Sequence, residues 1–221
     1  MESAKKAKSA ASRQKTKPGR KNKPPGKSAI SRLQILDAAA RLFRRQGYSE
    51  TTLRQIAKAA GLQAGSIYYY FGSKDEIVDE VLATGMRDIY KLVEKTVASL
   101  GDETTHRQRI EQGMIAHLDL LLTKGDYFSS NIRLYGQIPD ALKPRHAHLR
   151  QRYGRLWDQI LRQAQDAGEI RPGLKIVPLR MFILGALNWT MEWFDPDRYS
   201  IHDFARQINT MVFDGIRVER E

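Results

Sequence analysis

Cysteine is absent from the 221-residue chain, so neither a disulfide framework nor a thiolate site can form. Long hydrophobic runs are also missing. The longest uncharged apolar run, 181–191, is bounded by Arg180 and Glu192 and falls well short of the roughly 20 residues that span a membrane. The basic N-terminus is not followed by the apolar stretch of a secretion signal. We therefore expect a cytoplasmic protein without a membrane segment.

The sequence also lacks the patterns of the common catalytic and metal sites. Its five histidines are scattered, and His146 and His148 would point to different sides of a helix, unlike a metal-binding pair four residues apart. Neither the full pattern of a Gly-rich phosphate loop nor a Gly-x-Ser-x-Gly nucleophile turn occurs. We expect no enzyme activity, no metal and no cofactor.

Positive charge is concentrated at one end of the chain. The formal net charge is +12, to which residues 1–30 contribute +9, residues 31–75 contribute +4 and residues 76–221 contribute −1. A basic region of this kind favours a polyanionic partner such as nucleic acid, and only for the N-terminal third.

Residues 1–30 are rich in Lys, Ser, Ala, Pro and Gly and have almost no large apolar side chains. Such a segment cannot offset the entropy that folding costs, so we predict a disordered basic tail. Its lysines can add sequence-independent affinity for DNA phosphates. A purely solubilising tail is the alternative.

The stretch 51–74 holds two short helical patterns separated by a glycine. Thr51 or Thr52 can cap a first helix with apolar residues at helical spacing, and Gly61 supplies the turn that ends it. A second helix, 63–71, would turn Ile67 and Phe71 inward. This is a helix-turn-helix pattern.

Small residues stand at the start of the second helix, where Gly65 costs about 1 kcal/mol of helix stability relative to alanine. Close approach to a DNA base edge would explain them, and the tyrosines at 68–70 and Lys74 suit contacts with phosphates. The alternative is that the aromatic run is a core segment.

The rest of the chain shows helical periodicity and no strand pattern, which predicts an all-α fold. Expected helices cover residues 31–47, 74–100, 104–123, 126–136, 144–167, 178–194 and 200–217. The first has one broad apolar face that includes Leu33, and Ser73 opens a capping box with Glu76 at the start of the second. We predict a basic tail at 1–30, a three-helix DNA-binding domain at 31–76 and a ligand-binding and dimerisation domain at 77–221.

The helix at 178–194 is apolar nearly all round, so it must be covered on every side. One subunit can cover only part of it. We therefore expect a two-fold homodimer in which this helix and 200–217 meet their copies as a four-helix bundle. A monomer with a fully wrapped central helix is the alternative.

Aromatic and polar residues in the second domain suggest a site for a small apolar molecule. Asn188 and Glu192 stand within the most apolar helix, where polar groups need hydrogen bonds from a ligand or from a dimer interface. Aromatic residues of a helical bundle can equally be core. The expected ligand-binding residues are Tyr135, Tyr153, Trp157, Asn188, Trp189, Glu192 and Trp193.

Residues 31–82, which include LFRRQGYSETTLRQIAKAAGLQAGSIYYYFGSKDEIVDEVL, resemble the N-terminal domain of the TetR family of bacterial transcriptional regulators. The resemblance implies a dimer that binds a palindromic DNA operator, with Gln63, Ala64, Gly65 and Ser66 near bases and Thr52, Tyr68, Tyr69, Tyr70 and Lys74 on the backbone. Ala64 stands where members often have a polar side chain, so Gln63 or Arg54 is expected to supply more of the base recognition.

A second resemblance concerns Asn188 to Pro196, where the pattern NWxxxWFxP is similar to regulators that sense acyl-CoA thioesters in fatty-acid or sterol catabolism. It implies a ligand-responsive repressor with a small apolar effector. Glu192 stands where related proteins often have a basic residue. The remaining candidates for a phosphate contact are Arg133, Arg145, Arg150 and Arg152. A non-sequence-specific architectural DNA-binding protein is the alternative function.

Overall fold

The computed structural model describes residues 27–134 and 136–216, and over these ranges the chain is helical with no strand. The predicted tail, apart from its last residues, and Tyr135 lie outside the described residues. The elements, where η marks short 3₁₀ or π turns, are α1 Lys27–Gln46, α2 Leu53–Ala59, η1 Ala64–Tyr69, α3 Lys74–Ala98, α4 His106–Asp119, η2 Leu120–Lys124, α5 Asp126–Arg133, η3 Asp140–Leu142, α6 Lys143–Asp166, α7 Ile176–Trp189, η4 Thr190–Glu192 and α8 Ile201–Ile216. The all-α expectation is confirmed.

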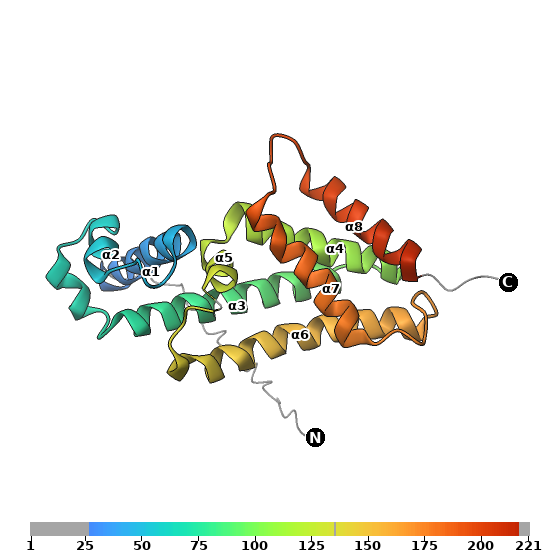
Figure 1. Ribbon diagram of the computed structural model, residues 1–221, viewed down its shortest axis with the longest axis horizontal. Coiled ribbons are helices and arrows are strands. Elements are labelled where there is room, and N and C mark those ends of the chain that lie inside the picture. The colour runs from blue at the N-terminus through green and yellow to red at the C-terminus, as the bar shows by residue number, and fades with distance from the viewer. Residues whose placement is uncertain (1–26, 135, 217–221) are drawn as a thin grey trace, which may run out of the picture.

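Two hydrophobic cores lie at the two ends of an elongated molecule, and α3 runs through both (Figure 1). The smaller core joins α1, α2 and η1 to the first turns of α3, which contribute Ile77 and Val78. The larger core joins α4, α6, α7 and α8 to the later turns of α3, which contribute Ile89 and Val93. One continuous helix therefore connects the helix-turn-helix unit to the larger bundle.

Helices α2 and α3 each begin directly after a residue whose side chain caps the helix. The Thr52 hydroxyl accepts a hydrogen bond from Gln55 N, and Gln55 Oε1 accepts one from Thr52 N, which is a complete capping box. Ser73 accepts from Glu76 N, but the Glu76 carboxylate accepts from Gly72 N rather than from Ser73 N. The box expected there is therefore only half formed.

The second helix of the helix-turn-helix unit is shorter than expected. Residues 64–69 form a 3₁₀ turn instead of a helix over 63–71. Gly61, with φ +72°, makes the left-handed turn before it, as the sequence predicted. Leu33 also differs from the expectation. It was predicted on the apolar face of α1, but it is 57 % exposed.

Two expected long helices end early. The one expected at 104–123 ends at Asp119 and continues as a wide turn, η2, up to Gly125, where a Cβ would lie 2.1 Å from the Leu120 carbonyl oxygen. The one expected at 178–194 is α-helical only from Ile176 to Trp189 and then tightens into η4. This tightening changes the direction of the residues after 189.

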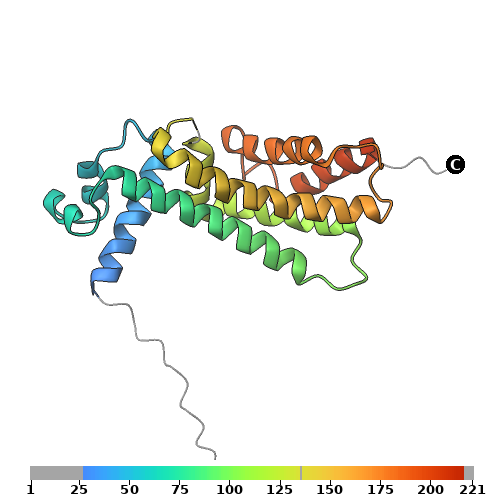
Figure 2. The ribbon, with the colours of Figure 1, turned by 90° about the horizontal axis from the view of Figure 1, so that it is seen from below.

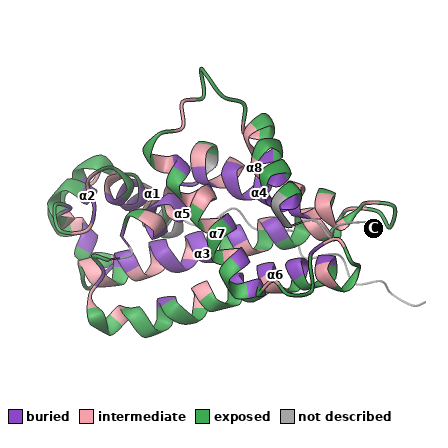
Figure 3. Cartoon of the chain, turned by 45° about the vertical axis from the view of Figure 1, so that its right-hand side comes forward, coloured by how far each residue is buried: buried purple, intermediate pink, exposed green. Residues whose placement is uncertain are grey.

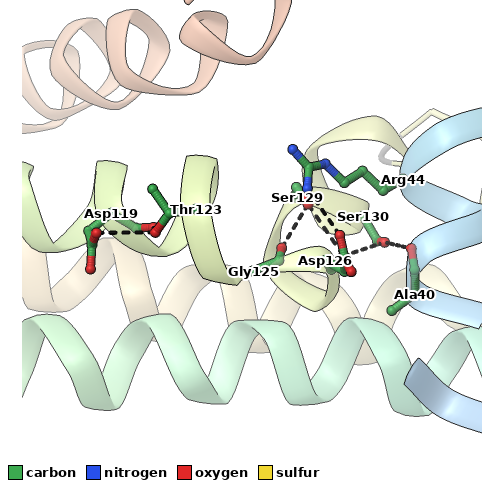
Figure 4. Close-up of polar contacts among 8 residues, drawn as sticks. All are labelled: Ala40, Arg44, Asp119, Thr123, Gly125, Asp126, Ser129 and Ser130. Carbon is green, nitrogen blue, oxygen red and sulfur yellow. Dashed lines mark hydrogen bonds and ion pairs between the residues drawn. The ribbon is translucent and has the colours of Figure 1, made fainter. Parts of the chain in front are cut away.

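The short helix α5 packs between α1 and α3, and Figure 2 shows it beside both. Its contact with α3 is very close, since a Cβ at Gly85 would lie 2.3 Å from the Tyr127 carbonyl oxygen. Asn131 Nδ2 donates to Leu82 O at 3.1 Å on the same side. The Ser130 hydroxyl lies 3.0 Å from Ala40 O in α1, and Arg44 pairs with Asp126 at 3.0 Å (Figure 4).

The outer face of α7 is apolar and uncovered in the single chain (Figure 3). Phe182 and Trp189 are each 66 % exposed, and Gly185 between them has no atom within 4 Å of a Cβ position. These three residues fall at helical spacing on one stripe. The dimer stays a prediction, and this stripe is the surface it would cover.

Candidate DNA-binding surface and ligand cavity

The residues expected to approach DNA bases lie on the outside of η1. Gln63, Ala64 and Gly65 are exposed, and Ser66 is half-buried. Gln63 occupies the cap position without using its side chain to cap, so the side chain is available to a partner. Nothing lies within 4 Å of a Cβ position at Gly65, which leaves room for another surface at this point.

The tyrosine run divides between surface and core. Tyr68 is 63 % exposed and Tyr69 is 81 % exposed, whereas Ile67 and Phe71 are buried. Tyr70 is half-buried and its ring meets that of Tyr69 edge-on, with centroids 5.1 Å apart. The alternative of a purely aromatic core segment therefore does not hold for Tyr68 and Tyr69. Both side chains are therefore accessible to a partner.

Thr52 and Arg54 lie beside this surface, at the start of α2, and both are exposed. The Thr52 hydroxyl is already used in capping. A DNA phosphate at this helix start would meet the Thr52 cap and the positive end of the α2 dipole together.

Lys74 has a structural role that the sequence did not indicate. Its Nζ lies 2.9 Å from Tyr48 O, 2.9 Å from Thr51 O and 3.9 Å from the Tyr48 ring centroid. The Tyr48 hydroxyl in turn donates to Asp75. Burial lowers the pKa of Lys74. Two of its three ammonium protons thus fasten the loop between α1 and α2 to the start of α3, which leaves one proton for a phosphate.

A cavity of about 410 Å³ lies between α3, α4, α5, α6 and α7, and is called here the α3–α7 cavity. It has apolar walls, a polar group on one side and arginines at its edge. Its lining residues are Met86, His117, Phe128, Ile132, Arg150, Gln151, Tyr153, Gly154, Arg155, Arg180, Met181, Leu184, Gly185 and Asn188.

A hydrogen-bonded group of three side chains forms the polar side of this cavity. His117 Nδ1 lies 2.8 Å from the Tyr153 hydroxyl, and His117 Nε2 lies 3.1 Å from Asn188 Oδ1. Burial lowers the pKa of His117 to about 4 and raises that of Tyr153. Both side chains are therefore neutral at pH 7, and the group presents hydrogen bonds without net charge.

The three tryptophans of the predicted ligand site do not come together. Trp157 is fully buried in the larger core, against Gly113, where a Cβ would lie 3.2 Å from the indole. Trp189 is on the exposed stripe of α7. Trp193 packs edge-on against Phe204, with centroids 5.3 Å apart, beyond the tightened end of α7.

Of the remaining predicted ligand residues, Tyr153 and Asn188 line the α3–α7 cavity. Glu192 lies in a different groove, 3.8 Å from Arg133. The reason is the change from α-helix to 3₁₀ turn after Trp189, which breaks the helical register that had placed Asn188 and Glu192 on one face.

His117 and Phe128 are cavity residues that were not among the expected ligand-binding residues, whereas Arg150 was expected only as a candidate phosphate contact. His117 did carry a signal, because it follows Ile110 and Met114 at helical spacing on the inward face of α4. A titratable side chain on a buried face needs a partner. No such signal exists in the sequence for Phe128, because the packing of the short helix α5 determines which of its side chains face the cavity.

The arginines proposed as phosphate partners have different surroundings. Arg150 lies at the edge of the α3–α7 cavity and also lines a neighbouring cavity of about 500 Å³ with Lys143 and His146. Arg145 pairs with Asp79 at 2.5 Å. Arg152 lies over the Tyr90 ring, 4.3 Å from its centroid. Arg150 is thus the one of the four that borders the α3–α7 cavity.

Over 27–134 and 136–216, no group of three or more His, Asp or Glu side chains is placed to hold a metal ion. Within the same ranges, none of the helices combines the length and apolar character needed to cross a membrane.

Several known proteins similar to this chain are transcriptional regulators. The fatty acid metabolism regulator protein of Bacillus subtilis is 26 % identical over 194 residues, covering 83 % of this chain and 94 % of that protein. The repressor KstR2 of Rhodococcus jostii is 28 % identical, covering 86 % and 93 %. The crystal structure of FadR from Bacillus subtilis with stearoyl-CoA shares the fold, with a TM-score of 0.69 and 24 % identity over 84 % of this chain and 99 % of FadR.

The family assignment covers both cores. Residues 35–81 match the bacterial regulatory proteins of the tetR family, which is the part of the chain that contains the helix-turn-helix unit. Residues 103–216 match the tetracycline-repressor-like C-terminal domain, which contains α4 to α8. The chain therefore belongs to the TetR family of bacterial regulatory proteins.

Proposed function

We propose that this protein is a transcriptional repressor that binds a palindromic operator as a homodimer and releases it when a small apolar molecule enters the α3–α7 cavity. The observation that carries the proposal is the position of α5. Phe128 and Ile132 of this helix line the cavity, while Ser130 contacts α1 of the helix-turn-helix unit. A ligand and DNA would thus act on the same short helix.

The DNA side of the proposal rests on η1 and its surroundings. Gln63, Ala64 and Gly65 form an exposed, sterically open start to the second element of the helix-turn-helix unit, the part that enters the major groove in such proteins. Tyr68 and Tyr69 follow it with exposed side chains. The basic residues of 1–30 would add phosphate contacts without sequence preference.

The dimer is supported by the exposed stripe of Phe182, Gly185 and Trp189. Two large apolar side chains at 66 % exposure are costly to leave in water, and a flat glycine between them lets a second helix approach closely. A two-fold axis near Gly185 would bring the same stripe of two subunits together. Sedimentation of wild type and Phe182→Glu tests this, because a monomer of the variant and a dimer of the wild type are expected.

The two faces of α5 connect the cavity to the helix-turn-helix unit in this proposal. Asp126, Ser130 and Asn131 bond α1 and α3, and Gly85 lets the α5 backbone lie directly on α3. A ligand that displaces Phe128 must move these contacts too, since they belong to the same two turns of helix. The ligand shifts the DNA-binding equilibrium only by the difference in its affinity for the DNA-binding arrangement of α5 and the displaced one. A difference of about 1.4 kcal/mol changes the DNA affinity tenfold.

The effector class follows from the lining of the cavity. Met86, Phe128, Ile132 and Leu184 give it apolar walls, and Arg150 stands at its edge. The volume of about 410 Å³ is within the range that holds drug-sized ligands. An apolar chain with an anionic head fits this arrangement, and a long-chain acyl-CoA is such a molecule. The similarity to a regulator of fatty acid metabolism supports the same class.

The experiment begins by selecting bound DNA from a random pool and mapping the site by footprinting. A short palindromic site is expected, whereas uniform coating would indicate an architectural DNA-binding protein. Gel shifts on the selected DNA with palmitoyl-CoA, free CoA and palmitate then test the effector. Release by palmitoyl-CoA alone supports the proposal. Release by a different apolar compound retains the ligand-responsive function and removes the acyl-CoA assignment.

A further inference from the structure

We infer that the Asn188 amide N–H groups bind a carbonyl oxygen of the effector, so that the α3–α7 cavity selects an acyl compound over the same chain without its carbonyl. This inference rests on the proposed function, because it concerns a ligand of the same cavity. The direction of each hydrogen bond in the group of His117, Tyr153 and Asn188 supports it.

The direction of the first hydrogen bond is set by Asn188. Its Oδ1 faces His117 Nε2 at 3.1 Å, and an amide oxygen can only accept. His117 Nε2 must therefore carry the proton. His117 is 1 % exposed, and its burial keeps the ring neutral, so only one of its nitrogens is protonated.

The second hydrogen bond then has a fixed direction as well. With the ring neutral and Nε2 protonated, His117 Nδ1 is an acceptor, and the Tyr153 hydroxyl at 2.8 Å donates to it. Tyr153 is 4 % exposed and His117 is 1 % exposed. The group therefore runs from Tyr153 through His117 to Asn188, and both nitrogens of the buried His117 ring have a hydrogen-bond partner within it.

Asn188 is the member of the group that meets the cavity. It is half-buried and lines the space, and its amide oxygen is already used by His117. Among the residues that the structure describes, its amide nitrogen donates to none. Two N–H donors thus border a space whose nearby walls, such as Leu184 and Met181, are apolar.

Donors without a partner in a mostly apolar site favour a ligand that supplies an acceptor. A carbonyl, ester or thioester oxygen fits this requirement, and an ammonium group, which has no acceptor lone pair, does not. Donors that lose hydrogen bonds to water without gaining another partner are unfavourable. Because Asn188 is only half-buried, we expect about a tenfold preference for a ligand that pairs them. The amide turned the other way would present Oδ1 and favour a donor instead.

The test compares palmitoyl-CoA with S-hexadecyl-CoA, the thioether that keeps the chain and the CoA head but lacks the carbonyl oxygen. Binding to the full-length dimer is measured by calorimetry. The wild type is expected to bind palmitoyl-CoA about tenfold more tightly. Asn188→Leu and Asn188→Asp should bind the two compounds with equal affinity. Gln151→Leu, which removes another polar lining side chain outside the group, should keep the preference.

Equal affinity of the wild type for the two compounds, or a preference that persists in Asn188→Leu, would overturn the inference and leave the proposed function intact. Failure of both compounds to bind the wild type would overturn the acyl-CoA assignment itself. Asn188→Asp retains an oxygen toward His117, so it covers the case in which Asn188→Leu does not fold. Thermal melts and DNA binding of each variant establish that it is folded.

Discussion

The Ser130 hydroxyl in α5 lies 3.0 Å from the Ala40 carbonyl oxygen in α1, and both groups are buried. Two residues earlier, Phe128 lines the α3–α7 cavity. One helix of two turns therefore touches the helix-turn-helix unit with one face and the cavity with another. Its short length makes independent movement of the two faces implausible, which is why α5 is central to the predictions that follow.

Gly85→Ala tests the closeness of α5 to α3. The added Cβ would lie 2.3 Å from the Tyr127 carbonyl oxygen, so the backbone of α5 must move. We expect a loss of roughly 1–3 kcal/mol in the free energy of unfolding, the usual cost of overpacking, together with changed DNA affinity. Gly101→Ala is the matched control, because nothing lies within 4 Å of its Cβ position. Urea melts that give equal stability for the two variants would argue against a tight α3–α5 contact.

Tyr69→Ala and Phe71→Ala should separate DNA binding from folding. Tyr69 is 81 % exposed, so its truncation is expected to weaken operator binding and leave stability unchanged. Phe71 is 1 % exposed, and its truncation should cost roughly 3–5 kcal/mol of stability. Gel shifts and denaturant melts on both variants check this. Wild-type operator affinity in Tyr69→Ala would remove the tyrosine from the DNA-binding surface.

Lys74→Ala should lower both stability and DNA affinity. From the sequence, this variant is expected to remain as stable as the wild type, because the lysine was assigned to a phosphate. The two carbonyl contacts at 2.9 Å change that expectation, and a loss of about 1–3 kcal/mol is now predicted from carbonyls left without their charged donor. Thermal melts of the variant and the wild type measure this loss. An unchanged melting temperature would mean that Lys74 acts in DNA binding alone.

Because burial lowers the pKa of His117, we expect the protein to lose stability in acid. That pKa is about 4 in the folded protein, below the ordinary value near 6.5, so below pH 6.5 the unfolded chain binds a proton that the folded protein does not. Stability should fall by about 2 kcal/mol between pH 7 and pH 5 through this group. Urea melts at the two pH values measure it. His117→Gln should lose that part of the pH dependence, and an equal pH dependence in the variant would contradict the assignment.

The helices and the helix-turn-helix unit could be predicted from the sequence because their signals are local. Thr52 and Gln55 form a capping box three residues apart, and Gly61 takes the left-handed conformation at the turn. Small residues such as Gly65 also indicated an unusual second element. They did not reveal that the 3₁₀ form would replace the helix.

The cavity was harder to predict because it depends on contacts between distant segments. Asn188 and Tyr153 were identified, but their partner His117 comes from α4, far from both in the sequence. Trp193 was expected beside them and lies elsewhere, because the 3₁₀ turn after Trp189 ends the helical periodicity on which that expectation depended. Packing and helix ends, rather than composition, decide which aromatic residues line a cavity.

The most direct test of the account is a fluorescence anisotropy titration of the selected operator with wild-type protein, with and without saturating palmitoyl-CoA. Leu184→Trp, which enlarges a side chain in the apolar wall of the α3–α7 cavity and reduces the space for a ligand, serves as the matched variant. The account predicts that palmitoyl-CoA weakens DNA binding of the wild type by about tenfold or more, equivalent to about 1.4 kcal/mol of coupling, and has no effect on the variant. Identical DNA affinity of the wild type with palmitoyl-CoA bound and without it would contradict the account.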